Sequence, residues 1–196
     1  MSTHDPTGEE AIVLFETTTE WNTWLRKNHA KTKGVWLRLA KKNSGLRSIT
    51  YFEALEVALC HGWIDALKRS YDEVSWIQRF TPRGPRSGWS KINREKALAL
   101  IEAGVMLKAG LATIEQAKAN GNWDRAYEPA STATVPPDLQ AALNKNKKAK
   151  AFFATIKGNN RFAIVHRTQT AKTPATRAKR IATFVAMLER GEVFYP

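Results

Sequence analysis

The residues best suited to chemistry are concentrated in one stretch of the chain, residues 62–93. Arginines stand there among tryptophans, hydroxyl side chains, one aspartate and the turn-forming residues Gly and Pro. Arginine is rarely buried without a partner and tryptophan is seldom fully exposed, so this mixture predicts the wall of a cleft. Guanidinium groups, hydroxyls and the N–H groups of a helix start can all donate to a phosphate or carboxylate. We therefore expect a binding site for a small anionic or aromatic ligand, formed by Trp63, Asp65, Arg79, Thr81, Arg83, Ser87, Trp89, Ser90, Asn93 and, from the C-terminal region, Arg177.

Structural alternatives stay open for these residues. Asp65 can pair with Arg79 or Arg83 across a cleft, or it can form a structural ion pair or cap a turn. Tryptophans at this density can belong to the core, and Ser90 can simply cap the helix that follows it. No catalytic spacing within the stretch names a reaction, so catalytic residues and enzymatic activity stay open.

Cysteine and histidine offer little further chemistry. Cys60 and His61 are adjacent, and neighbours on a helix point about 100° apart, so the two are poorly placed to act as nucleophile and base. The other histidines are scattered, and the sequence contains no HExxH or CxxC motif, so we expect no metal site. No GxGxxG or Walker-type loop is present either, and we expect no cofactor.

The elements that must position the cleft alternate between strands and helices. Thr17-x-x-Glu20 and Thr50-x-x-Glu53 each have the form of a capping box, which predicts a helix start. Glycines and short apolar runs mark the other boundaries. Strands are expected at residues 12–15, 35–40 and 71–80, the last with Val74, Trp76 and Phe80 on its buried side, and further helices at 90–104 and 108–120.

The C-terminal region is expected to be helical. Thr173 and Pro174 have the form of a helix start, followed by an apolar stripe and a stop at Gly191. We expect an α+β fold, with a small N-terminal antiparallel or mixed sheet and packed helices, followed by a mainly helical C-terminal region. The predicted domains are an α+β core at residues 1–127, a Pro/Ser/Thr-rich linker at 128–137 and a helical subdomain at 138–196.

The charge is strongly basic, with a formal net charge of +13. Residues 131–196 hold twelve basic and three acidic residues, so this region carries most of the excess. Such a field attracts polyanions, and a nucleic-acid-binding protein acting through residues 145–180 is one alternative function. A solvated basic face is the other interpretation. No apolar run is long enough to span a membrane and no signal peptide is evident, so a cytoplasmic location is expected. The oligomeric state stays open.

Several of these motifs together resemble a known family. The run Glu53–Asp65, Arg79-Phe-Thr-Pro-Arg83, Ser87–Ser90, Asn93 and Asn122–Tyr127 are similar to the YdeI/OmpD-associated family, also labelled bacteriocin-protection proteins. Thr176-Arg177 and Arg180-Ile181 extend this resemblance, which spans nearly the whole chain, whereas His61 departs from the family pattern. The resemblance implies a role in stress resistance and no defined reaction, so a protein-interaction module is a further alternative.

Overall fold

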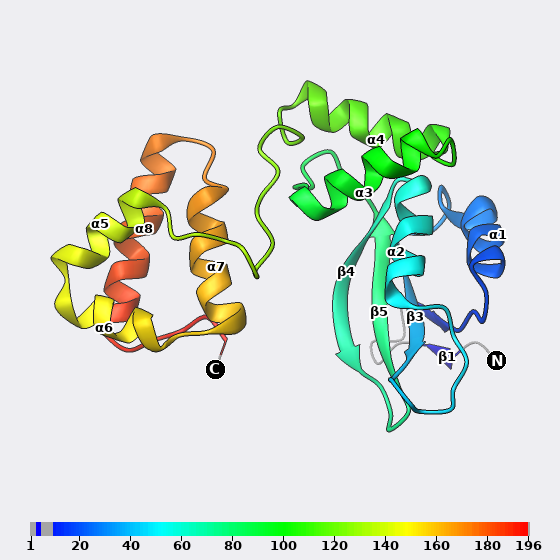
Figure 1. Cartoon of the computed structure of the whole chain (residues 1–196), viewed down its shortest axis with the longest axis horizontal. Coiled ribbons are helices and arrows are strands. Elements are labelled where there is room, and N and C mark those ends of the chain that lie inside the picture. The colour runs from blue at the N-terminus through cyan, green and yellow to red at the C-terminus, as the bar shows by residue number, and fades with distance from the viewer. Residues whose placement is uncertain (1–2, 5–9, 196) are drawn as a thin grey trace. The chain divides into compact units, whose positions relative to one another are not determined.

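The structure, a computed structural model, describes residues 3–4 and 10–195 and divides the chain into two compact bodies. The first body comprises residues 1–87 and 93–124, and the second comprises residues 88–92 and 125–196. The chain therefore enters the second body briefly before it completes the first. Figure 1 shows the sheet and helices of the first body and the helices of the second.

The first body is built on a mixed sheet of five strands within the described residues. The strand order is β1-β2-β3-β5-β4, and β2 and β3 run parallel while the other neighbours are antiparallel. The α+β fold and the mixed sheet predicted from the sequence are thereby confirmed. The strands are β1 (Thr3–His4), β2 (Ala11–Val13), β3 (Val35–Ala40), β4 (Trp63–Ser70) and β5 (Ser75–Pro82).

Helices α1 (Thr18–Asn28) and α2 (Tyr51–Cys60) pack side by side on one face of this sheet (Figure 1). Both begin with the predicted capping box, in which the threonine side chain accepts from the N3 backbone and the N3 glutamate accepts from the cap. The indole N–H of Trp21 donates to the carbonyl of Ala54 (3.0 Å), which ties the two helices together.

Helices α3 (Lys91–Glu102) and α4 (Lys108–Ala119) follow the sheet, and α4 packs closely on α2. A Cβ atom added at Gly110 would lie 2.7 Å from the carbonyl oxygens of Leu59 and Cys60, closer than real Cβ atoms approach. Glycine at this position therefore allows α4 to rest on the last turn of α2.

The strand predicted at residues 71–80 is wrong at its start, and β4 was not predicted. Residues before Ser75 form a turn, and Val74 is exposed. Residues on both faces of β5 are buried, so the expected alternation fails. Ser75 and Ile77 on one face are 0% and 1% exposed, and Phe80 on the other face is 0% exposed and packs against Trp21 of α1. β4 is an edge strand whose residues 66–70 are all exposed, so this part of the strand shows no alternation of buried and exposed residues.

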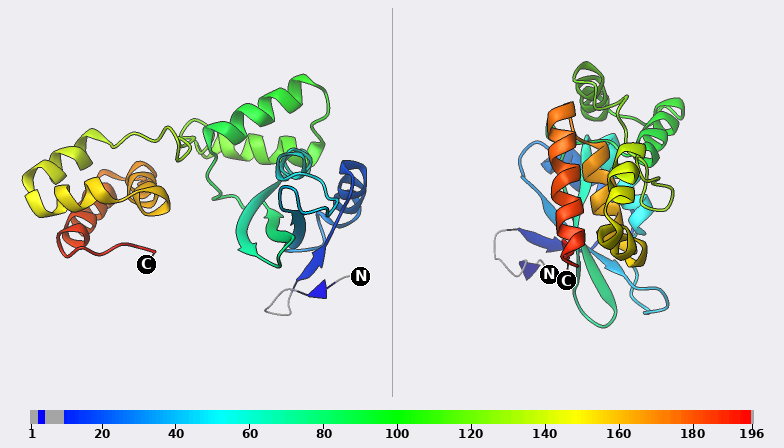
Figure 2. Two further views of the ribbon diagram at one scale, coloured as in Figure 1. Left: turned by 60° about the horizontal axis from the view of Figure 1, so that its bottom comes forward. Right: turned by 90° about the vertical axis from the view of Figure 1, so that its left-hand side faces the viewer.

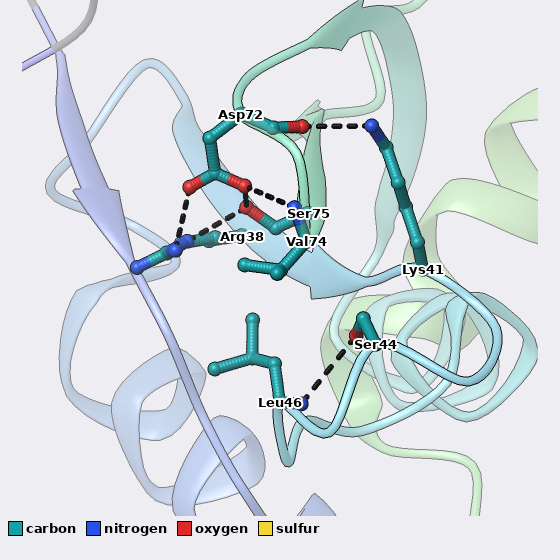
Figure 3. Close-up of polar contacts among 7 residues, drawn as sticks. All are labelled: Arg38, Lys41, Ser44, Leu46, Asp72, Val74 and Ser75. Atoms are coloured by element: carbon teal, nitrogen blue, oxygen red, sulfur yellow. Dashed lines mark hydrogen bonds and ion pairs between the residues drawn. The ribbon is translucent and has the colours of Figure 1, made fainter.

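A polar network holds the turn between β4 and β5 (Figure 3). Asp72 accepts from Arg38 Nη2 (2.6 Å), from the Ser75 hydroxyl (2.6 Å) and from the Val74 backbone N–H (3.0 Å). The Ser75 hydrogen bond, with the backbone bonds and the Arg38 charge, lowers the pKa of Asp72. This network explains why a serine is fully buried at the first residue of β5.

The second body contains the predicted C-terminal helices (Figure 2). Thr173 caps the last helix through the backbone N–H of Thr176, and Gly191 follows that helix with a positive φ of 72°. Residues 133 and 135, in the segment predicted as a linker, pack against the core of this body. The helices are α5 (Pro137–Lys145), α6 (Lys147–Thr155), α7 (Gly158–Gln169) and α8 (Pro174–Glu189), and their core includes Leu139, Leu143, Phe153, Ile164, Phe184 and Leu188. Within the described ranges, no helix is both long and apolar enough to cross a bilayer.

Candidate functional site

The two tryptophans of the predicted cleft lie in different bodies. Trp63, in β4, is 1% exposed, and its indole N–H donates to the carbonyl of His29 (3.1 Å) within the first body. Trp89 is 2% exposed and belongs to the second body, where its carbonyl accepts from the backbone N–H of Tyr127 (2.9 Å). Both indoles are therefore core side chains.

The charged residues of β4 and β5 make structural contacts. Arg79 forms a two-pronged ion pair with Glu10, at 2.8 Å from Nε and 2.6 Å from Nη2. Asp65 accepts from the hydroxyl of Tyr51 (3.0 Å), and Thr81 pairs with Ile64 in the ladder between the two strands. Arg79 was one of the two arginines expected to pair with Asp65, and its guanidinium instead binds Glu10.

The loop after β5 holds further predicted residues of the first body. The backbone N–H of Arg83 donates to the carbonyl of Gly62 (2.9 Å), and the Arg83 side chain is buried. The hydroxyl of Ser87 accepts from the backbone N–H of Gly84 (3.1 Å), which closes a turn. Asn93 lies in the first part of α3 and is half-buried.

The remaining predicted residues belong to the second body. Ser90 forms an isolated bridge with Tyr127. Arg177 binds both carboxylate oxygens of Asp138, at 2.5 Å from Nε and 2.8 Å from Nη2, and donates from Nη1 to the carbonyl of Thr168 (2.9 Å). The Asp138 hydrogen bond raises the pKa of Arg177. A role in ligand binding for the ten predicted residues stays a prediction, since they are divided between the two bodies.

A pocket of about 520 Å³ opens within the first body between α1, α2 and the residues that follow α3. Its α1 wall is one helical face, because Thr18, Asn22 and Arg26 are spaced four residues apart. Its α2 wall is the face formed by Glu53, Glu56, Val57 and Cys60, spaced three or four residues apart. We call this cavity the α1–α2 pocket.

Hydrogen bonds fix the side chains of Asn22, Glu53 and Glu56 in the α1–α2 pocket. His61 donates from Nε2 to Oδ1 of Asn22 (2.7 Å), so the Asn22 amide presents its nitrogen as the other polar atom. Burial, His29 and Arg26 lower the pKa of His61 to about 4, so this ring is neutral near pH 7. The Asn22 wall is therefore held by an uncharged partner.

The α2 wall carries two glutamate side chains and a thiol. Glu53 accepts from the Thr50 backbone and hydroxyl, and these bonds lower its pKa. Glu56 accepts from Lys96 Nζ (2.6 Å). Burial, with the nearby Glu56 charge, raises the pKa of Cys60, which makes this thiol a poor nucleophile near pH 7.

Sequence reasoning did not identify this pocket. Each helical face is visible in the sequence as polar residues at helical spacing, but nothing in the sequence shows that the two faces meet. Across residues 3–4 and 10–195, no three His, Cys, Asp or Glu side chains are grouped so that they could hold a metal ion.

Comparison with known families divides the chain in a similar way. Residues 13–113 match a family described as "Domain of unknown function (DUF8412)". Residues 132–191 match a family described as "Bacteriocin-protection, YdeI or OmpD-Associated", which confirms the predicted resemblance for this region. The resemblance was expected to span nearly the whole chain, and this extent is corrected, because the motifs at residues 53–93 fall within the other match. No curated protein and no solved structure matches the chain.

Proposed function

The chain belongs to the family described as "Domain of unknown function (DUF8412)", and we propose that its first body binds a small amphipathic zwitterion in the α1–α2 pocket. Neither this family description nor that of the bacteriocin-protection, YdeI or OmpD-associated match at residues 132–191 names a ligand, so the proposal is based on the pocket itself. The observation that carries the proposal is a wall of hydrogen-bond donors on α1 that faces a wall of carboxylates on α2.

The α1 wall suits an acidic group. Arg26 supplies a guanidinium, Asn22 an amide nitrogen, and Thr18 and Thr19 supply hydroxyls along the same side of the helix. Charge-assisted hydrogen bonds from such groups to a carboxylate are about twice as strong as neutral ones. A ligand carboxylate is therefore expected at this wall.

The α2 wall argues against a ligand that is only anionic. Glu53 and Glu56 would repel a second negative charge, whereas an ammonium group would be attracted to them. Lys96 offsets part of the Glu56 charge, so Glu53 is the stronger partner for an ammonium group. A molecule that carries both charges satisfies both walls.

The rest of the pocket is apolar. Val57 on α2 and Leu100, Val105 and Leu107 near the end of α3 contribute aliphatic surface. A volume of about 520 Å³ lies within the range of about 300–1,000 Å³ that is typical of small-molecule sites. An amino acid with a large apolar side chain has the required size and groups.

We further propose that the chain has the protective role named in the family description and acts in the cytoplasm. Binding of the zwitterion would be the molecular basis of that protection. Binding without turnover is sufficient for it. The neutral Cys60 thiol supports this choice, because an activated nucleophile would have a lowered pKa.

Isothermal titration calorimetry with three related probes tests the proposal. L-phenylalanine carries both charges, 3-phenylpropionate lacks the amine and phenethylamine lacks the carboxylate. We expect L-phenylalanine to bind more tightly than either analogue. Equal binding of the three probes, or no binding of L-phenylalanine, contradicts the proposal.

Two variants distinguish binding in the pocket from a general effect of positive charge. Arg26→Gln removes the guanidinium of the pocket, and Lys27→Gln removes an equal charge from the neighbouring exposed residue, which does not line it. Loss of a charged hydrogen bond costs about 1.5–3 kcal/mol, so we expect about 10- to 150-fold weaker binding for Arg26→Gln alone. Similar losses in both variants would count against the pocket.

A further inference from the structure

Three aromatic rings of the second body lie together at its surface. The Tyr127 and His166 ring centroids are 4.4 Å apart and meet edge to face, and Phe162 lies 5.3 Å from His166 and 6.4 Å from Tyr127. All three side chains are half-buried, so each keeps part of its surface in solvent. We call this group the aromatic shelf.

The backbone holds the aromatic shelf in place. Phe162 and His166 are four residues apart on α7, so they share one helical face. Tyr127 is fixed from both sides, since its N–H donates to Trp89 and its carbonyl accepts from the N–H of Lys91 (both 2.9 Å). The rings are therefore presented on fixed elements and not on a free loop.

The His166 ring belongs to the shelf as an aromatic and not as a cation. Burial, together with the charges of Arg167 and Arg180, lowers the pKa of His166. Near pH 7 the imidazole is neutral, and its face can stack on another ring.

Polar groups adjoin the shelf. A cavity of about 270 Å³ is lined by Tyr127 itself together with Lys91, Arg125, Gln169 and Thr170, and also by Ala126 and Glu128. The Glu128 carboxylate is paired with Lys91, which offsets its charge. Amine, guanidinium, amide and hydroxyl groups are all donors to phosphate or sugar oxygens. The cavity is small for a whole nucleotide but is large enough for one of its groups.

The carboxylates of the second body are largely held by internal partners. Glu128 pairs with Lys91, Asp138 with Arg177, and Glu192 with Arg190. Residues 131–196 hold twelve basic and three acidic residues, and most of the basic side chains are exposed. Arg167 and Arg180 lie close enough to the shelf to act electrostatically on His166. The surface around the shelf is therefore attractive to a polyanion.

We propose that the aromatic shelf is a binding site for single-stranded nucleic acid, in which bases stack on Phe162, Tyr127 and His166 while Arg125 and the surrounding cations contact the phosphates. Stacking on aromatic rings combined with a positive surface is the physical basis of sequence-tolerant single-strand binding. A base-paired duplex hides its base faces and would leave the rings unused. This site lies in the second body and goes beyond the function proposed for the first.

Fluorescence anisotropy with the full chain and a labelled oligodeoxythymidine tests the site. Phe162→Leu removes the ring but keeps an apolar side chain, and Phe162→Tyr keeps the ring. Stacking is worth about 1–3 kcal/mol per base, so we expect about 5- to 150-fold weaker binding for Phe162→Leu and little change for Phe162→Tyr. Circular dichroism verifies that each variant is folded, and Tyr127→Leu replaces Phe162→Leu if the latter unfolds.

Competition experiments separate stacking from charge. A duplex of the same length and heparin should compete more weakly than unlabelled oligodeoxythymidine. The double variant Lys147→Gln, Lys148→Gln should weaken the binding of all three polyanions alike, because it changes only the electrostatic attraction of the surface. The proposal is overturned if heparin competes as well as the oligonucleotide, if a single nucleotide binds as tightly as the strand, or if Phe162→Leu and Phe162→Tyr bind equally.

Discussion

Nε2 of His61 and Oδ1 of Asn22 lie 2.7 Å apart, and this hydrogen bond joins the end of α2 to the middle of α1. The two residues are separated by 39 positions in the chain, yet they form the polar connection behind the α1–α2 pocket. The neighbouring His29 ring has its centroid 5.5 Å from that of His61, and Arg26 adds a positive charge nearby. A protonated His61 would therefore be both poorly solvated and repelled.

Stability should fall in mild acid because of His61. Its pKa in the folded chain is about 4, below the ordinary value of 6.5, so the unfolded chain takes up a proton first as the pH drops. The free energy of unfolding is expected to decrease from about pH 6.5 down to about pH 4, by up to about 1.4 kcal/mol per pH unit. Urea denaturation across this range measures it. His61→Gln, which cannot titrate, should have a shallower slope; an unchanged slope would remove His61 as the cause.

Cys60 should report on occupancy of the pocket. It is the single cysteine of the chain, is buried and lines the pocket, so its alkylation is an unambiguous signal. With a raised pKa, the thiol should react slowly near pH 7 and up to about tenfold faster for each pH unit above it. Saturating L-phenylalanine should slow the reaction of the folded protein and not of the urea-unfolded chain. A rate that is already maximal at neutral pH would contradict the raised pKa.

Gly110→Ala should destabilise the protein. In an exposed helix this change stabilises by about 1 kcal/mol, because alanine is the better helix former. Here the new Cβ would meet the Leu59 and Cys60 carbonyl oxygens at 2.7 Å, and also the Met106 sulfur. We expect a net loss of about 1–3 kcal/mol in chemical denaturation. A gain in stability would show that α4 does not rest on α2 at this point.

Arg79→Gln should lower stability and leave binding in the pocket unchanged. Arg79 and Glu10 are partly buried, with side chains 27% and 17% exposed, and the change breaks a two-pronged ion pair. The expected loss is about 1–3 kcal/mol by thermal or urea unfolding. Arg86→Gln provides the control, because Arg86 is an exposed arginine of the same region. Weaker L-phenylalanine binding by folded Arg79→Gln would instead restore the residue to a ligand site.

Local signals predicted the helices well. The capping boxes at Thr17 and Thr50 and the cap at Thr173 depend on residues three positions apart, so the sequence contains all the information that they need. β4 escaped prediction because its residues 66–70 are exposed at a sheet edge, with Lys68 and Arg69 over the rings of Trp76 and Trp36 (4.2 and 4.9 Å). Such an edge strand can be recognised only when the strand that it pairs with, here β5, is known.

The site was harder to predict than the fold. The arginines and tryptophans near residue 80 were conspicuous by type, but arginine type does not reveal its partner, and Glu10 lies 69 positions from Arg79. The α1–α2 pocket combines residues 18–26, 53–60 and 100–107, which tertiary packing alone brings together. Asn22 and Glu53 are ordinary polar helix residues until that packing is known.

The return of the chain to the second body has a consequence for inheritance and gene fusion. The partners of Tyr127 and Glu128 come from residues 88–92, which are encoded before residues 93–124 of the other body. The region that matches the bacteriocin-protection family, residues 132–191, excludes that segment. A recombination event that transfers residues 125–196 alone would carry α5–α8 but would separate Tyr127 from its backbone partners Trp89 and Lys91. The chain passes between the bodies after residues 87, 92 and 124, so exchange of one whole body between proteins requires three crossover points.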